Sequence, residues 1–179
     1  GGVAGGASAA ARLRRLDEYA EIIMFEKGEY ISFANCGLPY YIGDVIPTRE
    51  ALIVQTVEQM SRKFNLDIRN LSEVISINKE EKKISVKNYR TGEVYEESYD
   101  TLVLSPGAKP IKPPIAGIED CKNLFTLRNI PDMDNIKSFL EEEKPKRAIV
   151  IGGGFIGLEM AENLHEKGVN VTLVEIGRA

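Results

Sequence analysis

The sequence predicts an α/β fold made of two Rossmann-like dinucleotide-binding units and an inserted β-meander. Residues 1–6 read GGVAGG and residues 152–157 read GGGFIG, about 150 residues apart. Glycine turns of this kind join a strand to a helix in dinucleotide-binding units. Between them, residues 73–99 alternate polar and apolar side chains, which is the pattern of short antiparallel strands.

Composition and charge exclude several functional classes. The 179 residues are 43% hydrophobic and 28% charged, as in a soluble globular protein, and the net charge of −4 argues against nucleic-acid or membrane partners. The longest nearly apolar run contains four glycines and a glutamate, and no signal peptide is visible. The two cysteines lie 85 residues apart, without a metal or disulfide pattern. We therefore expect a cytoplasmic protein without a metal site.

The remaining elements follow from periodicity and from turn residues. The first half predicts a helix at 5–16, a buried strand at 21–26, a helix at 47–64 that starts with Pro47-Thr48, and a meander with turns at 79–82 and 90–92. The second half predicts a buried strand within 101–108 that stops at Pro106-Gly107, a proline-rich connector at 109–120, an amphipathic helix at 131–146 and a strand–turn–helix–strand unit at 147–175.

The second glycine turn is the most specific motif. Gly152, Gly154 and Gly157 follow an apolar strand and open a helix, and Glu175 ends the next strand, 18 residues past Gly157. In this fingerprint the glycines allow a tight turn, close approach of a pyrophosphate and packing of the helix on the strand. The helix N-terminus binds the phosphates, with Ile156 in its first turn. Glu175 would accept the ribose hydroxyls and repel a 2′-phosphate, which predicts NADH over NADPH. A glycine-rich turn without a ligand is the alternative.

The first glycine turn is weaker by itself. It reads Gly1-x-Val3-x-x-Gly6, with valine where the middle glycine is usual, and Glu26 ends the next strand 20 residues after Gly6. Paired with the second turn, it indicates FAD at the first site and a nicotinamide cofactor at the second. No strand precedes the first turn, so we expect a fragment: an FAD-binding domain at 1–110 without its first strand, and an incomplete NAD-binding domain at 111–179.

Five segments resemble one family. GGVAGG, RRLDEYAEIIMFEKGEYISFANCGLPYYIG, LSPGA, FTLRN and VIGGGFIGLEMAENL look like the single-cysteine branch of the FAD- and NAD(P)H-dependent pyridine nucleotide-disulfide oxidoreductases. The likeness is greatest to the coenzyme A-disulfide reductases, including forms fused to a rhodanese domain. It implies electron transfer from NADH through FAD to a cysteine that reduces coenzyme A disulfide or persulfide. It also implies a homodimer whose C-terminal dimerisation domain is absent here.

The resemblance assigns site residues by position. Cys36 matches the redox cysteine. The positions matched to FAD are Gly1, Gly5, Gly6, Glu26, Lys27, Ser105, Pro106, Gly107 and Arg128. Phe155 matches the lid of the nicotinamide pocket and Glu159 another residue of that pocket. The positions matched to coenzyme A are Ser8, Arg12, Arg15, Ser32 and Asn35. For the two arginines a solvated basic patch is the alternative. A lysine of some members is replaced by Phe64, next to Lys63, which leaves that contact open.

One departure separates the possible reactions. Peroxidases and oxidases of this family carry a histidine in the first glycine turn, where this chain has Ala4. Loss of that acid–base group argues against peroxide or oxygen as the substrate. The runner-up is nevertheless an NADH oxidase or peroxidase that cycles Cys36 through sulfenic acid. An inactive nucleotide-binding module or electron-transfer partner is a further alternative. The single histidine, His165, is expected to be a solvated residue near a helix end.

Cys36 is expected to be a working thiol. Gly37, Leu38 and Pro39 follow it, and proline is tolerated in the first turn of a helix. Amides and the helix dipole there would stabilise a thiolate. A buried structural cysteine is the alternative, because cysteine is among the most buried residue types. Cys121 lies in a polar connector and is interpreted as incidental.

Overall fold

The computed structural model describes residues 1–177 and divides into two compact units. The first comprises Gly1–Phe33 and Ile53–Ala108, and the second comprises Ala34–Leu52 and the chain from Lys109 onward. The end of the first unit at Ala108 lies near the expected boundary at residue 110. The short segment Ala34–Leu52, which contains Cys36, belongs to the second unit although it lies early in the sequence.

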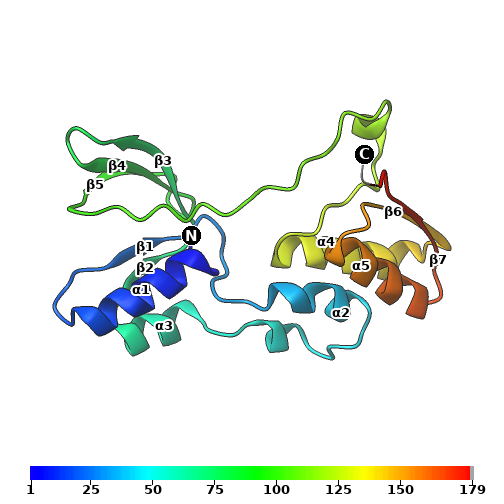
Figure 1. Ribbon diagram of the computed structural model, residues 1–179, viewed down its shortest axis with the longest axis horizontal. Helices are drawn as coiled ribbons and strands as arrows, with labels where there is room; N and C mark the ends of the chain where they lie inside the picture. Colours follow the sequence, from blue (N-terminus) through cyan, green and yellow to red (C-terminus); the bar gives the residue numbers. More distant parts are fainter. Residues whose placement is uncertain (178–179) are drawn as a thin grey trace. The chain divides into compact units, whose positions relative to one another are not determined.

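The first unit contains two helices, a two-stranded parallel sheet and a three-stranded meander. Its elements are α1 (Gly5–Leu16), β1 (Ile23–Phe25), α3 (Val57–Phe64), β2 (Asp67–Arg69), β3 (Ser72–Asn78), β4 (Lys83–Asn88) and β5 (Val94–Ser98). Strands β1 and β2 run parallel, and the meander has the antiparallel order β3-β4-β5. Helices α1 and α3 pack against each other and against this small sheet (Figure 1).

The core of the first unit lies between the two helices and the parallel pair. Its buried side chains are Ala10, Met24, Ile31, Met60, Leu66 and Ile68. Each is less than a tenth exposed, and burial of one such aliphatic side chain contributes about 1.5–3 kcal/mol. This packing holds the first glycine turn, which opens α1, at the end of β1.

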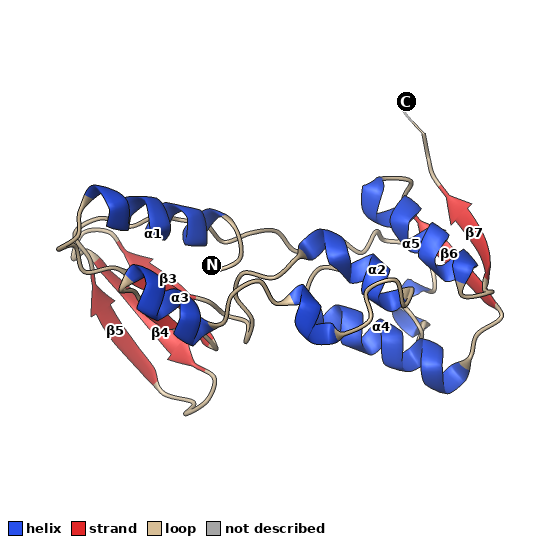
Figure 2. Cartoon of the chain, turned by 90° about the horizontal axis from the view of Figure 1, so that it is seen from below, coloured by secondary structure: helices blue, strands red, loops and turns tan. Residues whose placement is uncertain are grey.

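The second unit is built on one βαβ motif and the segment that follows Cys36. Its elements are the 3₁₀ helices η1 (Asn35–Gly37), η2 (Arg49–Leu52) and η3 (Ile118–Asp120), the helices α2 (Leu38–Ile42), α4 (Ile130–Glu143) and α5 (Phe155–Glu166), and the strands β6 (Arg147–Ile151) and β7 (Asn170–Val174). Strands β6 and β7 pair in parallel. Helix α2 packs against both α4 and α5 (Figure 2).

Most expected elements are confirmed. The α/β class, the helix at 5–16, the meander, the proline-rich connector, the helix at 131–146 and the final βαβ motif are all present. The strand expected at 21–26 is shorter, and its parallel partner β2 was not foreseen from the sequence. Gly168 ends the last helix as expected, with φ of 79°, a left-handed value that glycine adopts without strain.

The single helix expected at 47–64 is wrong. The chain forms the short η2, then an extended stretch in which Ile53 bridges Phe33, and only then α3. Thr56 begins α3 with a capping box: its hydroxyl accepts from the Gln59 amide at 3.2 Å, and the Gln59 side chain accepts from the Thr56 amide at 3.0 Å. A capping box fixes a helix start. The apolar residues before Thr56 therefore belong to η2 and to the extended stretch that follows it.

The buried strand expected at 101–108 is also wrong. The segment is irregular, and Val103 and Leu104 are 61% and 69% exposed. A strand needs a neighbour to complete its hydrogen bonds, and within residues 1–177 no strand pairs with this segment.

Among the helices of residues 1–177, none has the length and apolar character of a membrane-spanning segment.

Candidate cofactor and thiol site

The second glycine turn has the geometry that its fingerprint requires. Gly152 has φ of 107°, which L side chains rarely adopt. A Cβ on Gly157 would lie 1.9 Å from the Gly152 carbonyl oxygen, so helix and strand approach closely here. A Cβ on Gly154 would meet nothing within 4 Å. Gly152 therefore allows a tight turn, and Gly157 allows α5 to pack closely on the strand. Gly154 leaves an open surface in front of the α5 N-terminus.

Glu175 is bonded directly to this turn. Its carboxylate accepts from the Gly153 amide at 2.5 Å and from the Gly177 amide at 3.1 Å. The hydrogen bond from Gly153, and then that from Gly177, lower the pKa of Glu175, so the carboxylate is ionised at neutral pH. The predicted ribose contact of Glu175 stays a prediction, and the negative charge it depends on is present.

The first glycine turn repeats this arrangement. Glu26 accepts from the Gly2 amide at 2.6 Å and from the Gly28 amide at 2.8 Å. A Cβ on Gly6 would lie 2.0 Å from the Gly1 carbonyl oxygen, matching the close approach in the second turn. The first turn is therefore built like the second, although Val3 replaces its middle glycine.

Other residues matched to FAD lie at the same end of the first unit. A Cβ on Gly5 would lie 3.0 Å from the Ser105 hydroxyl oxygen, so the segment that continues into Pro106 and Gly107 approaches the glycine turn. Lys27 forms an ion pair with Glu73 at 2.7 Å, and this hydrogen bond raises the pKa of Lys27. The structure brings Ser105 and Glu26 to the first turn, and the cofactor contacts of all these residues stay predictions.

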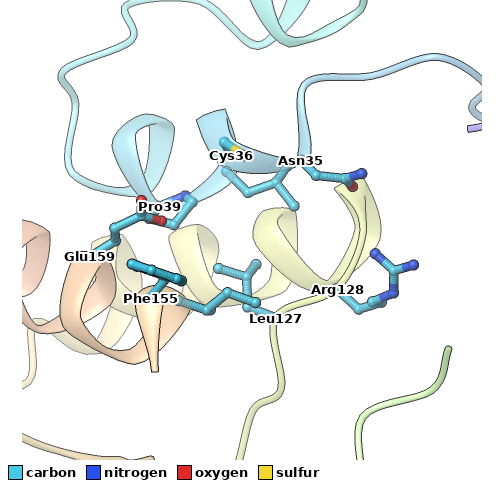
Figure 3. A pocket seen from close by; sticks show the side chains of 9 residues that line it. Asn35, Cys36, Pro39, Leu127, Arg128, Phe155 and Glu159 are labelled. Carbon is cyan, nitrogen blue, oxygen red and sulfur yellow. The ribbon is translucent and has the colours of Figure 1, made fainter. Parts of the chain in front are cut away.

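A cavity of about 270 Å³ lies within the second unit. It is lined by residues of η1 and α2, of the segment before α4, and of the first turns of α5: Asn35, Cys36, Leu38, Pro39, Leu127, Arg128, Phe155, Ile156 and Glu159. Six of these are predicted site residues, and they come from three parts of the sequence (Figure 3). The remaining three, Leu38, Pro39 and Leu127, were not predicted as pocket residues, although they lie within segments that carry the family resemblance.

Cys36 lies at the edge of this cavity as an exposed free thiol. It stands in η1, which runs directly into α2 with Pro39 in the first turn. The expected position before a helix N-terminus is therefore confirmed, and the alternative of a buried structural cysteine is wrong. Cys121 is exposed as well, and its thiol contacts the Gly117 carbonyl oxygen at 3.5 Å.

The polar end of the cavity contains Asn35 and Arg128. The side-chain oxygen of Asn35 is buried and has no hydrogen-bond partner among the described residues. Buried acceptors are nearly always satisfied, so this oxygen requires a donor from a ligand or from water. In Figure 3 the side chains of Asn35 and Arg128 extend to the same side of the cavity.

The other residues matched to coenzyme A lie in the first unit. Ser8, Arg12 and Arg15 are exposed on α1, and Ser32 has an unusual positive φ of 47°. Arg14, between the two predicted arginines, instead donates to the Phe64 carbonyl at 2.9 Å and to the Asn65 carbonyl at 2.8 Å. Arg14 therefore links α1 to α3, and Arg12 and Arg15 face solvent.

The model of the pyridine nucleotide-disulphide oxidoreductase family matches residues 1–179. The chain belongs to this family. It is 45% identical over 174 residues to coenzyme A disulfide reductase of Staphylococcus epidermidis, a match that covers 97% of this chain and 39% of the relative. A Staphylococcus aureus protein of the same name is 44% identical over the same length. The chain thus spans about two fifths of the length of these family members.

Solved structures of the family agree with this fold. Reduced Bacillus anthracis CoADR-RHD has 69% sequence identity and a TM-score of 0.97, over 99% of this chain and 32% of that one. An NAD-dependent persulfide reductase from A. fulgidus has 37% identity and a TM-score of 0.89, over 97% and 32%. A water-forming NADH oxidase from Lactobacillus brevis has 29% identity and a TM-score of 0.88, over 98% and 38%.

Proposed function

We propose that the protein containing this chain is a cytoplasmic, homodimeric flavoprotein that uses NADH to reduce coenzyme A disulfide or coenzyme A persulfide at Cys36. The observation that carries the proposal is the cavity in which the exposed Cys36 thiol and the first turns of α5, which follow the second glycine turn, form one lining. The names of the staphylococcal relatives and of the A. fulgidus persulfide reductase support the substrate class.

The residues of the first turn fit FAD. The Gly6 position has no room for a side chain, and the Glu26 carboxylate, bonded to the Gly2 amide, would accept from ribose hydroxyls. Ser105 lies beside this turn, Lys27 directly follows Glu26, and Arg128 lines the cavity of the second unit. When bound, FAD supplies a route for two electrons from NADH to a disulfide.

Cys36 performs the sulfur chemistry. Its thiolate attacks one sulfur of coenzyme A disulfide, so that a Cys36–coenzyme A disulfide forms and the other coenzyme A leaves as a thiolate that takes a proton from water. Two electrons then break the mixed disulfide, which releases the second coenzyme A thiolate and restores the Cys36 thiolate. A second protein cysteine is unnecessary in this cycle, because the substrate supplies the partner sulfur.

Recognition of coenzyme A depends on phosphate and amide contacts. Arg12 and Arg15 are exposed on one side of α1 and are suited to bind phosphates, with Ser8 nearby. Asn35 precedes the thiol, and its unpartnered oxygen fits an amide or hydroxyl donor of the ligand. Ser32 contributes a further polar group, as the resemblance implies.

An NADH oxidase or peroxidase that cycles Cys36 through sulfenic acid is the second candidate. The likeness to a water-forming NADH oxidase favours it. Ala4 argues against it, because the first turn lacks the histidine that would serve as the acid–base group for peroxide. The fold is shared by both reactions, so the choice depends on the substrate test.

The substrate test uses the full-length protein carrying its flavin. NADH oxidation is followed side by side with coenzyme A disulfide, a coenzyme A persulfide, hydrogen peroxide and oxygen. We expect kcat/KM for at least one coenzyme A substrate to exceed those for peroxide and oxygen by about a hundredfold or more, since a dedicated polar recognition site discriminates strongly. Faster turnover of peroxide or oxygen would overturn the proposal.

Replacement of the thiol separates its chemistry from NADH oxidation. Cys36→Ser should lower turnover of coenzyme A disulfide to background, because the nucleophile is lost. Flavin reduction by NADH, measured by absorbance, should persist. Cys121→Ser is the matched control and should retain both activities. Loss of both reactions in Cys36→Ser alone would give Cys36 a structural role instead.

A further inference from the structure

Asp44 lies directly after α2 and bonds to both neighbouring helices. Its carboxylate accepts from Lys137 of α4 and from Lys167, the C-cap residue that follows α5. Its backbone has φ of 64°, a left-handed value that aspartate and asparagine tolerate better than most residues. The hydrogen bonds from Lys137 and then Lys167 lower the pKa of Asp44, so the pairs persist at neutral pH.

Lys137 attaches the end of α2 in two further ways. Its ammonium donates to the Tyr41 carbonyl oxygen at 3.3 Å and lies 4.8 Å from the centre of the Tyr41 ring. The side chain is only 15% exposed, and Glu141 lies 3.4 Å away on the same helix. A lysine at the last carbonyls of a helix stabilises that end. Helix α2 is therefore held at its C-terminal end by a partly buried cation.

Gly43 forms a contact with α5 beside these ion pairs. A Cβ on Gly43 would lie 2.1 Å from the Asn163 side-chain oxygen, so the backbone of the α2 end lies directly against that side chain. Asn163 is 3% exposed and donates to the Glu159 carbonyl oxygen at 2.8 Å. Glu159 lines the cavity that contains Cys36. The contacts at the end of α2 thus continue along α5 to the cavity wall.

The cavity lies at the N-terminal ends of α2 and α5, and the ion pairs of Asp44 lie at the C-terminal ends of the same two helices. The cavity lies where η1, the start of α2, the segment before α4 and the start of α5 meet, and Asp44 joins the end of α2 to α4 and to the end of α5. We propose that Asp44 is a positioning residue that holds Cys36 in register with the α5 wall of the cavity. This inference rests on the proposed redox function of Cys36.

The segment that joins Cys36 to Asp44 is short. Residues 35–42 form η1 and α2 without interruption. At a rise of about 2.0 Å per 3₁₀ residue and 1.5 Å per α-helical residue, this stretch is about 13 Å long. A displacement at its far end is therefore transmitted to the thiol at its near end. Misplacement of a reacting group by about 1 Å can cost on the order of a hundredfold in rate.

Asp44→Asn in the full-length flavin-loaded protein tests the inference. Asparagine keeps the shape and tolerates the left-handed backbone, but it removes the charge that both lysines bind. The first readout is the alkylation rate of Cys36 by iodoacetamide in the reduced protein, resolved by mass spectrometry with Cys121 as internal reference. We expect a change of about threefold or more at Cys36 and none at Cys121, because thiol reactivity follows its local surroundings.

The second readout is transient kinetics of the two half-reactions. We expect transfer of electrons to the Cys36–coenzyme A disulfide to slow by about tenfold, with flavin reduction by NADH within about twofold of wild type. Asp44→Glu retains the charge and should recover most of the rate. Asp67→Asn, which removes an exposed aspartate paired with Arg69 in the first unit, is the matched control and should match wild type.

The outcomes separate this inference from the proposed function. Unchanged Cys36 alkylation and unchanged half-reactions in Asp44→Asn would overturn the positioning role, as would equal slowing of both half-reactions. The alkylation measurement needs no coenzyme A substrate, so it remains decisive if the wild-type protein does not reduce coenzyme A disulfide. Failure of the wild type with both coenzyme A disulfide and a coenzyme A persulfide would contradict the proposed function alone.

Discussion

Glu26 and Glu175 occupy matching places in the two glycine turns. Each carboxylate accepts from the amide of the second glycine of its turn and from the amide two residues further along its own segment. The pairing fixes each acid beside its turn. At the residue scale, we therefore expect cofactor choice to depend on two carboxylates that the turns orient.

Removal of the charge at Glu175 should weaken discrimination against NADPH. In Glu175→Gln, the repulsion between this carboxylate and a 2′-phosphate is lost, and close like charges cost several kcal/mol. The ratio of kcat/KM for NADH to that for NADPH should fall by at least about tenfold. The wild type should prefer NADH. A wild-type preference for NADPH would contradict the role given to Glu175.

Two glycines of the second turn should respond differently to alanine. At Gly157 the added methyl meets the Gly152 carbonyl oxygen, so Gly157→Ala should lower the free energy of unfolding by about 1–3 kcal/mol and abolish NADH binding. At Gly154 the methyl meets no protein atom within 4 Å. Gly154→Ala should therefore keep the wild-type stability and still bind NADH weakly. Wild-type NADH affinity in Gly154→Ala, measured by titration, would contradict a nucleotide in front of this turn.

At the scale of elements, the start of α3 is set by its capping box and could not be located from the spacing of apolar residues. The Thr56–Gln59 pair begins α3, whereas Pro47-Thr48 in the sequence predicts an earlier start. Thr56→Ala should lower the free energy of unfolding by about 1 kcal/mol, because a helix cap is lost. Denaturant titration checks this value, with Thr48→Ala as a control that should have no comparable effect.

The ion pairs at the end of α2 also predict a dependence on pH. The pKa of Asp44 is lowered in the folded protein, so its contribution to stability is complete above the unfolded pKa of about 3.9. That contribution disappears as the pH falls through the lower, folded pKa. The contribution is modest, about 1 kcal/mol at most, because Asp44 is 60% exposed. Asp44→Asn should therefore be less stable at pH 7, and the difference from wild type should shrink below about pH 4.

At the scale of the whole molecule, the chain passes between its two units three times, after Phe33, Leu52 and Ala108. The segment 34–52 comes from the N-terminal part of the sequence but packs on α4 and α5. Arg49 strengthens this attachment because its guanidinium donates to the Asp134 carboxylate, with contacts at 2.8, 2.9 and 3.2 Å. Cleavage of the chain between the two units at one of these points therefore leaves the contacts of residues 34–52 with α4 and α5 intact.

A protease cut in the exposed connector 110–117 should consequently leave the two fragments together. The contacts of residues 34–52 with α4 and α5 are buried or ion-paired, and they do not depend on the connector. The fragments should elute as one species in native gel filtration and separate in urea. Separation in native buffer would contradict this assembly, and Arg49→Ala should lower the urea concentration that separates them.

The sequence predicted those parts of the fold and site that depend on local patterns. Gly152, Gly157 and Glu175 lie within one continuous motif, so their geometry could be expected from spacing alone. The residues of the cavity could be predicted only from the family resemblance, because Cys36, Arg128 and Phe155 are distant in sequence. The contacts of Asp44 and Asn163 had no local signal, since an aspartate after a helix and an asparagine within one are common. The strand expected at 101–108 failed because apolar residues alone do not supply a neighbouring strand.

The paired turns have a consequence for how such units are detected. The middle glycine differs between them, with Val3 in one and Gly154 in the other, yet the bond from a turn amide to an acid at the end of the next strand is the same in both. The two turns are therefore more alike in their hydrogen bonds than in their amino-acid residues. A structural criterion based on the hydrogen bond from a turn amide to the acid after the next strand identifies both units, Gly2 with Glu26 and Gly153 with Glu175. A criterion that requires the middle glycine misses the first unit.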